Sequence, residues 1–257
     1  GVLKDSFNKM IRRLNDLVIS EYQAKDELQK AEISEQKMAM LYLKQQINPH
    51  FLYNTLDMIR LKAAINKDTE VSQMLMKLVS FYRLSTKVHD SMVAVRKEVE
   101  MLDAYMSLMC YRYSDIIYRS EIEPGALDIE IPNFILQPLL ENSLMHGLKD
   151  RRYQGTIILK IYRNEQDKNE LNIWLIDDGI GIPDDKMAEL NAYNAKDSEA
   201  LYRVQTRTEG DRTHLGVINV ISRLKLYYQE NAEVIYMRNE TGGTTVKIKI
   251  KTASEET

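Results

Sequence analysis

Apolar residues recur in a four-three pattern through the first part of the chain, from residue 3 to about 45. The pattern runs through Leu3, Phe7, Met10, Leu14, Leu17, Ala24, Leu28, Ala31, Met38 and Tyr42. No proline interrupts this stretch of the sequence. A repeat this long predicts a parallel coiled coil or helical bundle, because a lone helix would leave its apolar seam exposed to water. We therefore expect a homodimer.

Pro49 falls inside this helical pattern. Proline lacks a backbone donor and its ring clashes with the preceding turn, so we expect a kink or a break at this residue. The apolar pattern resumes over residues 51–63, and two further helices are expected from about 70 to 88 and from about 95 to 114. The chain is thus predicted to be helical up to about residue 115.

A mixed pattern of strands and helices follows. Short β-type runs occur at residues 116–118, 129–131, 156–162, 171–176, 233–236 and 244–250. Helices are expected over residues 134–148, with Pro138 in the first turn, and over residues 215–228. Residues 184–213 are polar with little periodicity, and we expect them to form the longest loop.

Composition and charge exclude some classes of protein. The 257 residues can form one large domain or two smaller ones. The 35 basic and 38 acidic residues give a net charge of −3, which argues against a dedicated nucleic-acid binder. Cys110 is the single cysteine, so no disulfide can form within one chain. The lack of a disulfide framework fits a protein of the reducing cytoplasm. Because the sequence opens at Gly1 directly in helical pattern, we expect the natural protein to extend upstream.

The segment Asn48–Asn54 carries the first candidate for chemistry, His50 beside Pro49. Imidazole has an unperturbed pKa of about 6.5, so at neutral pH one ring nitrogen is available as a nucleophile. A histidine at a predicted kink, together with the nucleotide-type clusters that follow, predicts a protein that phosphorylates itself on His50.

The segment Asp177–Gly181 follows a predicted strand and enters a loop. A carboxylate at a strand end can accept a hydrogen bond from an exocyclic amine such as that of adenine, and Gly179 and Gly181 let the backbone pass close to the base. The alternative is a glycine-containing turn that closes a hairpin, and this cluster alone does not separate the two.

Glu141, Asn142, Met145 and His146 lie on the predicted helix 134–148 and form two pairs spaced four residues apart. The Asn142 and Glu141 oxygens suit Mg²⁺, which often bridges phosphates with few protein ligands. The alternatives are a capping or buried polar role for Asn142 and a helix-end role for His146, favoured by the helix dipole.

Gly216 and Asn219 open a predicted helix after the long polar loop. A helix N-terminus can bind an anion, and the loop before it could close over a triphosphate as a lid. The alternative is an ordinary helix start. Gly242-Gly243 is most simply a hairpin turn between the last two strands.

In this order the clusters resemble those of sensor histidine kinases of the LytS/YesM-like group. The matching segments are Asn48–Asn54 (phosphoacceptor box), Leu136–Asn142 with His146-Gly147 (N box), Asp177–Gly181 and Leu215–Asn219 (two glycine boxes), and Gly242–Thr244 (closing hairpin). Residues 1–22 resemble the second helix of a HAMP signalling module.

The resemblance implies an α + α/β fold class. A long dimeric coiled coil or helical bundle is followed by a GHKL (Bergerat-type) α/β sandwich that binds ATP. The implied domains are the end of a HAMP-like helix at residues 1–22, a helical dimerisation and phosphoacceptor region at residues 23–115, and an ATP-binding catalytic domain at residues 116–253.

The resemblance also implies roles for residues. His50 is the phosphoacceptor, Asn54 one turn on can only orient it, Asn142 holds Mg²⁺, and Asp177 accepts from the adenine amine. The other implied cofactor-binding residues are Glu141, His146, Gly179, Gly181, Gly216, Asn219 and Thr245. The phosphate would pass to an aspartate of a response regulator, and the chain would be the cytoplasmic portion of a bacterial membrane receptor with an upstream sensor domain.

Two positions depart from the wider histidine kinase pattern. Phe51 stands directly after His50, where many of these kinases carry an acidic base, and His214 stands where the second glycine box usually begins with glycine. Two alternatives stay open: a non-catalytic nucleotide-binding signalling module of the same fold, and another ATPase of the superfamily. The second alternative leaves the segment Asn48–Asn54 unexplained.

Overall fold

The computed structural model describes residues 49–87, 91–196, 201 and 212–252. The predicted coiled coil over residues 3–45 and the HAMP-like helix over residues 1–22 lie outside the described residues. The chain divides into two compact units, Gly1–Thr55 and Leu56–Thr257, and the described part of the first is the start of helix α2 (Pro49–Ile65). Within the described ranges, no helix is both long and apolar enough to cross a membrane.

Helix α2 ends in a polar turn over residues 66–68. Lys67 takes a φ of 61°, and the Asp68 amide donates to the Ala63 carbonyl at 2.9 Å, which closes the last helical turn. The Asp68 carboxylate then accepts the Val71 amide at 3.1 Å and caps helix α3 (Thr69–Lys87). The two helices therefore end and begin where their polar residues satisfy the free backbone groups.

Helix α4 (Val95–Arg112) packs against α3 along one side. The Lys77 ammonium donates to the Ser107 hydroxyl at 2.6 Å, and the Phe81 and Tyr105 rings lie 5.4 Å apart. The side of α4 that faces the core carries apolar residues at helical spacing. Its buried residues are Val95, Glu98, Val99, Met101, Leu102, Tyr105 and Met106. Glu98 is the charged member of this otherwise apolar set.

The sheet of the described chain has five strands in the order β2-β4-β5-β7-β6. The strands are β2 (Ile116–Ile122), β4 (Gly155–Arg163), β5 (Glu170–Asp177), β6 (Ala232–Arg238) and β7 (Thr244–Lys251). Strand β2 runs parallel to β4, and the other pairs are antiparallel. A separate antiparallel pair joins β1 (Met92–Ala94) and β3 (Glu130–Pro132). The strand predictions from alternating apolar residues are confirmed.

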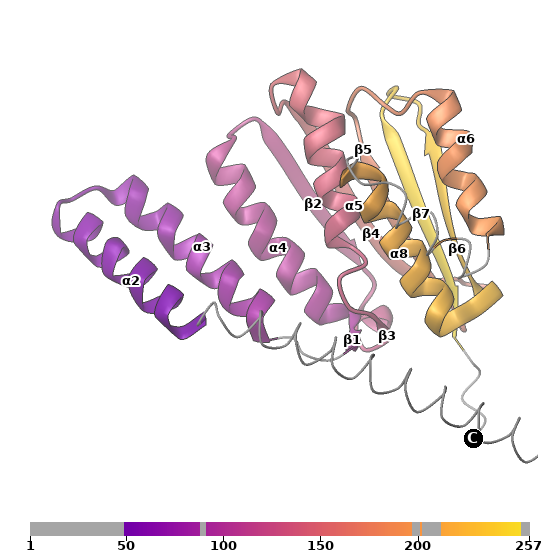
Figure 1. The fold of residues 1–257 in the computed structure, drawn as a ribbon, viewed down its shortest axis with the longest axis horizontal. Helices are drawn as coiled ribbons and strands as arrows, with labels where there is room; N and C mark the ends of the chain where they lie inside the picture. Colours follow the sequence, from indigo (N-terminus) through magenta and orange to yellow (C-terminus); the bar gives the residue numbers. More distant parts are fainter. Residues whose placement is uncertain (1–48, 88–90, 197–200, 202–211, 253–257) are drawn as a thin grey trace, which may run out of the picture. The chain divides into compact units, whose positions relative to one another are not determined.

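Helices α4, α5 (Gln137–Asn142) and α8 (Arg212–Tyr228) cover one face of this sheet (Figure 1). Leu102 of α4 and Leu139 of α5 line the same interior space as Leu159, Ile173 and Val246 of the strands. This apolar layer, in which the facing side chains are fully buried, is the main core of the unit. The predicted α/β layering of the C-terminal region is confirmed. Short helical turns η1 (Pro124–Ala126), η3 (Lys149–Arg151) and η5 (Gln229–Asn231) connect the main elements.

The prediction of a continuous loop over residues 184–213 is wrong at its start. Helix α6 (Asp184–Ala192) and turn η4 (Tyr193–Ala195) occupy its first part, and the rest of the predicted loop lies mostly outside the described residues. Leu190 and Tyr193 are buried, and the Asn191 side chain donates to the Tyr236 carbonyl of β6 at 2.9 Å. These tertiary contacts, rather than helical periodicity, hold the segment as a helix.

Candidate functional site

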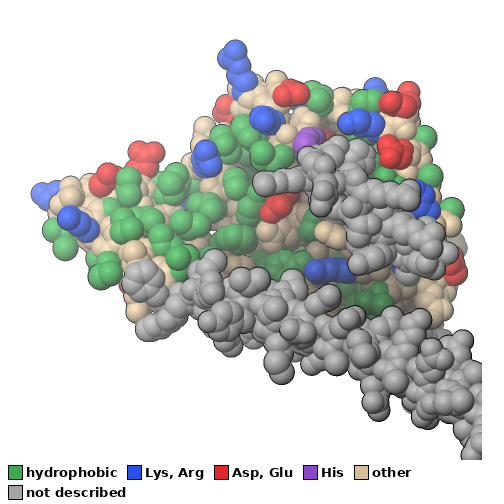
Figure 2. Space-filling view, viewed as in Figure 1, with side chains coloured by type: hydrophobic (Ala, Val, Ile, Leu, Met, Phe, Trp, Pro, Cys, Tyr) green, Lys and Arg blue, Asp and Glu red, His purple; other side chains and the backbone are tan. Residues whose placement is uncertain are grey.

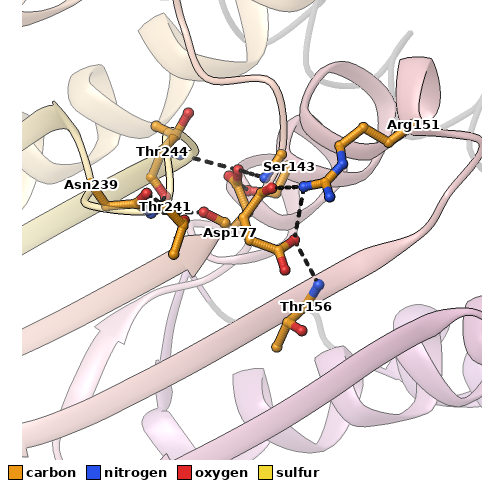
Figure 3. A network of polar contacts seen from close by, with 9 residues as sticks. Ser143, Arg151, Thr156, Asp177, Asn239, Thr241 and Thr244 are labelled. Carbon is orange, nitrogen blue, oxygen red and sulfur yellow. Dashed lines mark hydrogen bonds and ion pairs between the residues drawn. The ribbon is translucent and has the colours of Figure 1, made fainter.

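Asp177 ends strand β5 and is 2% exposed. Its Oδ2 atom accepts the Ser143 hydroxyl at 2.8 Å, and its Oδ1 atom accepts the amides of Gly179 at 3.0 Å and Thr244 at 3.1 Å. Figure 3 shows Ser143, from the helix after α5, and Thr244, from the start of β7, beside the carboxylate. One oxygen thus has two backbone donors, and the other has a single hydroxyl donor, which leaves Oδ2 an acceptor direction for a ligand.

Burial raises the pKa of the Asp177 carboxyl. The hydrogen bonds from Ser143, Thr244 and Gly179 act in the opposite direction, and the negative charge of Asp178 raises the pKa further. A buried carboxylate with three fixed donors is oriented before any ligand arrives, so it can discriminate between an amine and a carbonyl on a bound base.

The loop after Asp177 packs backbone to backbone against the segment after α5. A Cβ on Gly179 would lie 2.5 Å from the Gly147 carbonyl oxygen, and the Ile180 amide donates to that same oxygen at 3.0 Å. Gly181 takes a φ of +75°, and a Cβ there would lie 2.5 Å from the Gly242 carbonyl oxygen. Glycine is required at both positions because side chains have no room. Since the chain continues from this loop into α6 rather than into a paired strand, the hairpin-turn alternative is wrong.

A second layer of contacts holds this loop. The Asn239 side chain donates to the Asp177 carbonyl at 2.7 Å, and the Asp178 carboxylate accepts the Thr156 amide at 2.8 Å. Arg151 donates to the Asp178 carbonyl and lies 3.7 Å from its carboxylate. Sequence reasoning assigned no role to Ser143, Arg151 or Asn239. Ser143 directly follows Asn142 in a cluster that was already a candidate, whereas Arg151 and Asn239 carry no local signal.

The predicted helix over residues 134–148 consists of two parts. Helix α5 (Gln137–Asn142) has Pro138 in its first turn, as predicted, and the chain continues as the π-helix η2 (Ser143–Leu148). The wider π-turn brings the backbone of Gly147 against Asp177, where a Cβ would lie 3.1 Å from Oδ1. Such π-turns occur often at functional sites. The change of helix type could not be predicted from the four-residue spacing.

Asn142 lies at the junction between α5 and η2 and is half-buried. Glu141 is also half-buried and accepts the Gln137 side-chain amide at 2.8 Å, while His146 is exposed. Across the described residues, no three His, Cys, Asp or Glu side chains come together as a metal site. A Mg²⁺ ion at Asn142 would therefore take most of its ligands from phosphate oxygens and water, which is how this ion usually binds in nucleotide sites.

The remaining predicted residues of the nucleotide site lie on α8 and β7. Helix α8 begins at Arg212, so Gly216 is in its second turn and not at its start, which corrects the predicted helix opening. A Cβ on Gly216 would lie 3.7 Å from the Pro138 Cβ, an ordinary contact. Asn219 is exposed on α8, and Thr245 is buried in β7 as the register partner of Ile176. The His214 side chain lies outside the described residues.

His50 is the second residue of α2, and Asn54 follows it by one helical turn. The Asn54 side chain is exposed. Both residues belong to the unit Gly1–Thr55, whereas Asp177 belongs to the unit Leu56–Thr257. The residues around Asp177 fit an adenine nucleotide because they hold a buried carboxylate in a fixed orientation with one acceptor direction left on Oδ2.

Two family models match consecutive parts of the chain. Residues 38–117 match the model described as histidine kinase. Residues 128–254 match the model described as histidine kinase-, DNA gyrase B-, and HSP90-like ATPase. The second match includes Asn142, Asp177 and Thr244, and the first includes His50.

Individual proteins similar to the chain carry related names. Sensor protein LytS of Oceanobacillus iheyensis is 32% identical over 211 residues, which cover 81% of this chain and 33% of that protein. Sensor histidine kinase YpdA of Escherichia coli is 27% identical over 218 residues, which cover 83% and 34%. The chain thus spans about a third of the length of these relatives. Among solved structures, the histidine kinase domain of a blue-light activated histidine kinase from Erythrobacter litoralis EL346 matches with a TM-score of 0.43 and 17% identity, over 76% of this chain and 82% of that one.

Proposed function

The chain belongs to the sensor histidine kinase family of two-component systems, and on that premise we propose that it binds ATP at Asp177 and phosphorylates itself on His50. The phosphoryl group then passes to an aspartate of a separate response regulator. The observation that carries this proposal is the buried Asp177 carboxylate with its fixed donors Ser143, Gly179 and Thr244.

Adenine recognition follows from the acceptor character of Asp177. The exocyclic amine of adenine donates to Oδ2, the oxygen that also accepts the Ser143 hydroxyl. A guanine would present a carbonyl oxygen at the same place, and two acceptors repel each other. The pocket is therefore expected to select ATP over GTP.

Asn142 is proposed to hold Mg²⁺ through its side-chain oxygen. ATP supplies the phosphoryl group, and Mg²⁺ neutralises the charge of the phosphates. Glu141, His146, Gly216 and Asn219 are proposed to surround the phosphates and the ribose. Among the described residues, no three His, Cys, Asp or Glu side chains could hold the ion by themselves. Mg²⁺ and ATP are therefore expected to bind together.

His50 is the proposed nucleophile. A neutral ring nitrogen forms a bond to the γ-phosphorus while the bond from that phosphorus to the β–γ bridging oxygen breaks, and the electron pair leaves with ADP. Phe51 cannot act as a base, so Asn54 orients the imidazole from one turn away and does not take its proton. The kink at Pro49 stays a prediction.

A homodimer is proposed from the apolar surface of α2 and α3. Hydrophobic side chains gather over these helices in Figure 2. The large exposed ones are Met58, Ile59, Leu61, Ile65, Val71 and Met76. A contiguous apolar surface of this kind is typical of a protein–protein interface. We also propose an upstream membrane-bound sensor domain in the full-length protein.

Autophosphorylation with labelled ATP and Mg²⁺ tests the proposal, on this chain and on His50→Gln. We expect a label that is stable in alkali, labile in acid and absent from the variant. His89→Gln is the matched control, since it also removes an imidazole, at a position with no proposed role, and should keep the acid-labile label. Label that survives in His50→Gln would place the phosphate elsewhere. ATP binding without any label would favour the non-catalytic signalling module, for which Phe51 and His214 are the supporting features.

A further inference from the structure

Glu98 is a buried charged residue outside the nucleotide pocket. It lies in the first turn of α4 and is 1% exposed. Its Oε1 atom accepts the Phe134 amide at 2.8 Å, and its Oε2 atom accepts the Leu136 amide at 3.2 Å. Burial raises the pKa of this carboxyl, while the amides of residues 134–136 and the charge of Arg223 act in the opposite direction. A buried charge is retained only where such donors compensate for the lost water.

The backbone around Phe134 is shaped to hold this carboxylate. Phe134 has a φ of 59°, in the left-handed region that non-glycine residues rarely adopt. This conformation turns successive amides toward a common point and forms a concave anion site. The strained conformation persists because the Glu98 carboxylate fills that site. Leu136, whose amide completes it, directly precedes Gln137, the first residue of α5.

Other contacts hold this loop and the segment before β3. The amides at the start of α4 donate to the segment before β3: Val95 to the Ile129 carbonyl at 2.9 Å and Arg96 to the Leu127 carbonyl at 3.0 Å. Arg223 of α8 donates to the Asn133 carbonyl. The loop that leads into α5 is therefore held by α4, through Glu98, and by α8, through Arg223.

The opposite side of α4 faces the helical region. Lys77 of α3 donates to Ser107, and the Tyr111 hydroxyl donates to the Glu70 carbonyl of α3 at 3.1 Å. Helix α4 thus contacts α3 on one side and holds the entry to α5 through Glu98 on the other. A change in how α3 and α4 pack would reach the position of α5 through this carboxylate.

We propose that Glu98 is a positioning residue that fixes α5 so that the Asn142 side chain, at the far end of that helix, meets Mg²⁺ and the phosphates. The proposal rests on the proposed function. It predicts a larger effect on the phosphate end of the site than on the adenine end, because Asp177 is held not only by Ser143, next to Asn142, but also by Gly179, Thr244 and Asn239, which do not depend on α5. A residue that only stabilised the fold would affect the adenine and phosphate ends alike.

The test compares ATP binding with Mg²⁺ and with a chelator, for the unaltered protein and for Glu98→Gln. We expect adenosine and Mg²⁺-free ATP to bind within about twofold of the unaltered protein. The gain in ATP affinity on adding Mg²⁺ (the Mg²⁺-dependent tightening) and the autophosphorylation kcat should each fall roughly tenfold or more. Changes of this size are typical when a residue that orients a metal ligand is replaced. Glu100→Gln, an exposed position on the same helix, is the control and should change neither.

A second pair of variants keeps the test decisive if Glu98→Gln folds poorly. Arg223→Met removes the exposed guanidinium that holds the Asn133 carbonyl and should weaken the Mg²⁺-dependent tightening in the same direction, by a smaller factor. In an Asn142→Ala background, Glu98→Gln should have no further effect on that tightening, because the two residues act in series.

Two results would overturn the proposal. One is a lower melting temperature in Glu98→Gln with an unchanged Mg²⁺-dependent tightening, and the other is full additivity with Asn142→Ala. A failure of the proposed function is distinct from both, since then the unaltered protein itself would show no Mg²⁺-dependent ATP binding.

Discussion

The Thr244 amide donates to Asp177 Oδ1 at 3.1 Å, although the two residues are 67 positions apart in the chain. They meet because β5 and β7 are neighbours in the sheet, with Ile176 paired to Thr245. The carboxylate is thus held by the end of one central strand and the start of the next. Gly243 makes the approach possible, since a Cβ there would lie 2.1 Å from the Asp177 carbonyl oxygen.

Asp177→Asn should weaken ATP binding. The amide keeps one acceptor oxygen but places a donor against Ser143 or against the Gly179 and Thr244 amides. The lost charged hydrogen bond is worth about 1.5–3 kcal/mol, which corresponds to an increase in Kd of roughly ten- to hundredfold. Calorimetric titration measures it, with Asp184→Asn on the exposed start of α6 as the control. Equal affinities in the two variants would remove Asp177 from the binding site.

The raised pKa of Asp177 predicts a pH dependence of both binding and stability. The folded protein holds this proton more tightly than the unfolded chain does. The proton therefore stabilises the fold below the unfolded pKa of about 3.9, and that contribution is lost as the pH rises through the folded-state pKa. ATP affinity should change the opposite way, because the ionised carboxylate is the better acceptor.

Titrations of ATP between roughly pH 4 and pH 7 check this expectation, because the window begins at the unfolded pKa. The affinity of the unaltered protein should fall on acidification, starting above the pH at which an ordinary aspartate is protonated. The affinity of Asp177→Asn should vary less over the same range. Parallel pH profiles for the two proteins would assign the titration to another group.

Gly179→Ala and Gly216→Ala should behave differently, although both glycines resemble pocket residues in the sequence. The Gly179 Cβ would meet backbone atoms of Gly147 at 2.5 Å, which cannot move aside without shifting η2. We expect a loss of stability of about 1–3 kcal/mol together with loss of ATP binding. Urea unfolding and calorimetric titration of the same variant measure the two effects.

Gly216→Ala has room on the protein side, where the Pro138 Cβ is 3.7 Å away. Alanine in the second turn of α8 should stabilise the fold by about 0.4–1 kcal/mol, because it restricts the unfolded chain. ATP affinity should nevertheless fall, because the added Cβ would crowd the phosphates that are proposed to lie beside Gly216. A variant that gains stability and keeps full ATP affinity would show that Gly216 is outside the pocket.

The sequence predicts the sheet and the long helices well because their periodicity is local. Alternation along β4, for example, places Ile157, Leu159 and Ile161 in the core. Helix α6 was missed since Leu190 is its one buried residue, and a single apolar position produces no helical pattern. Its stability comes from contacts with β6, which lies far away in the chain.

The candidate site divides in the same way. Asp177 and its glycines are predictable because a carboxylate and close-packed backbone occupy one short segment. Ser143 and Thr244 bind Asp177 from 34 and 67 positions away, so their partnership depends on the strand order. Glu98 looks like any polar residue in an amphipathic helix, because its partners are amides 36 and 38 positions downstream.

The edge strand β6 provides the last prediction. Asn194 donates to the Val234 carbonyl at 2.6 Å and accepts the Val234 amide at 3.1 Å, so its side chain takes the place of a neighbouring strand. Asn191 makes the same two contacts with Tyr236, at 2.9 and 2.8 Å. Together these amides cover alternate backbone groups of an edge that would otherwise be open to pairing with another chain.

Asn194→Ala should therefore reduce the free energy of unfolding by about 1–3 kcal/mol, since it leaves two partly buried backbone groups without their partners. It should also increase aggregation on heating, because the exposed edge can pair with another copy. Urea unfolding and light scattering measure these effects, with Lys186→Ala on the exposed side of α6 as the control. If Asn194→Ala matched the control in both measurements, water would satisfy the Val234 backbone groups as well as the Asn194 side chain does.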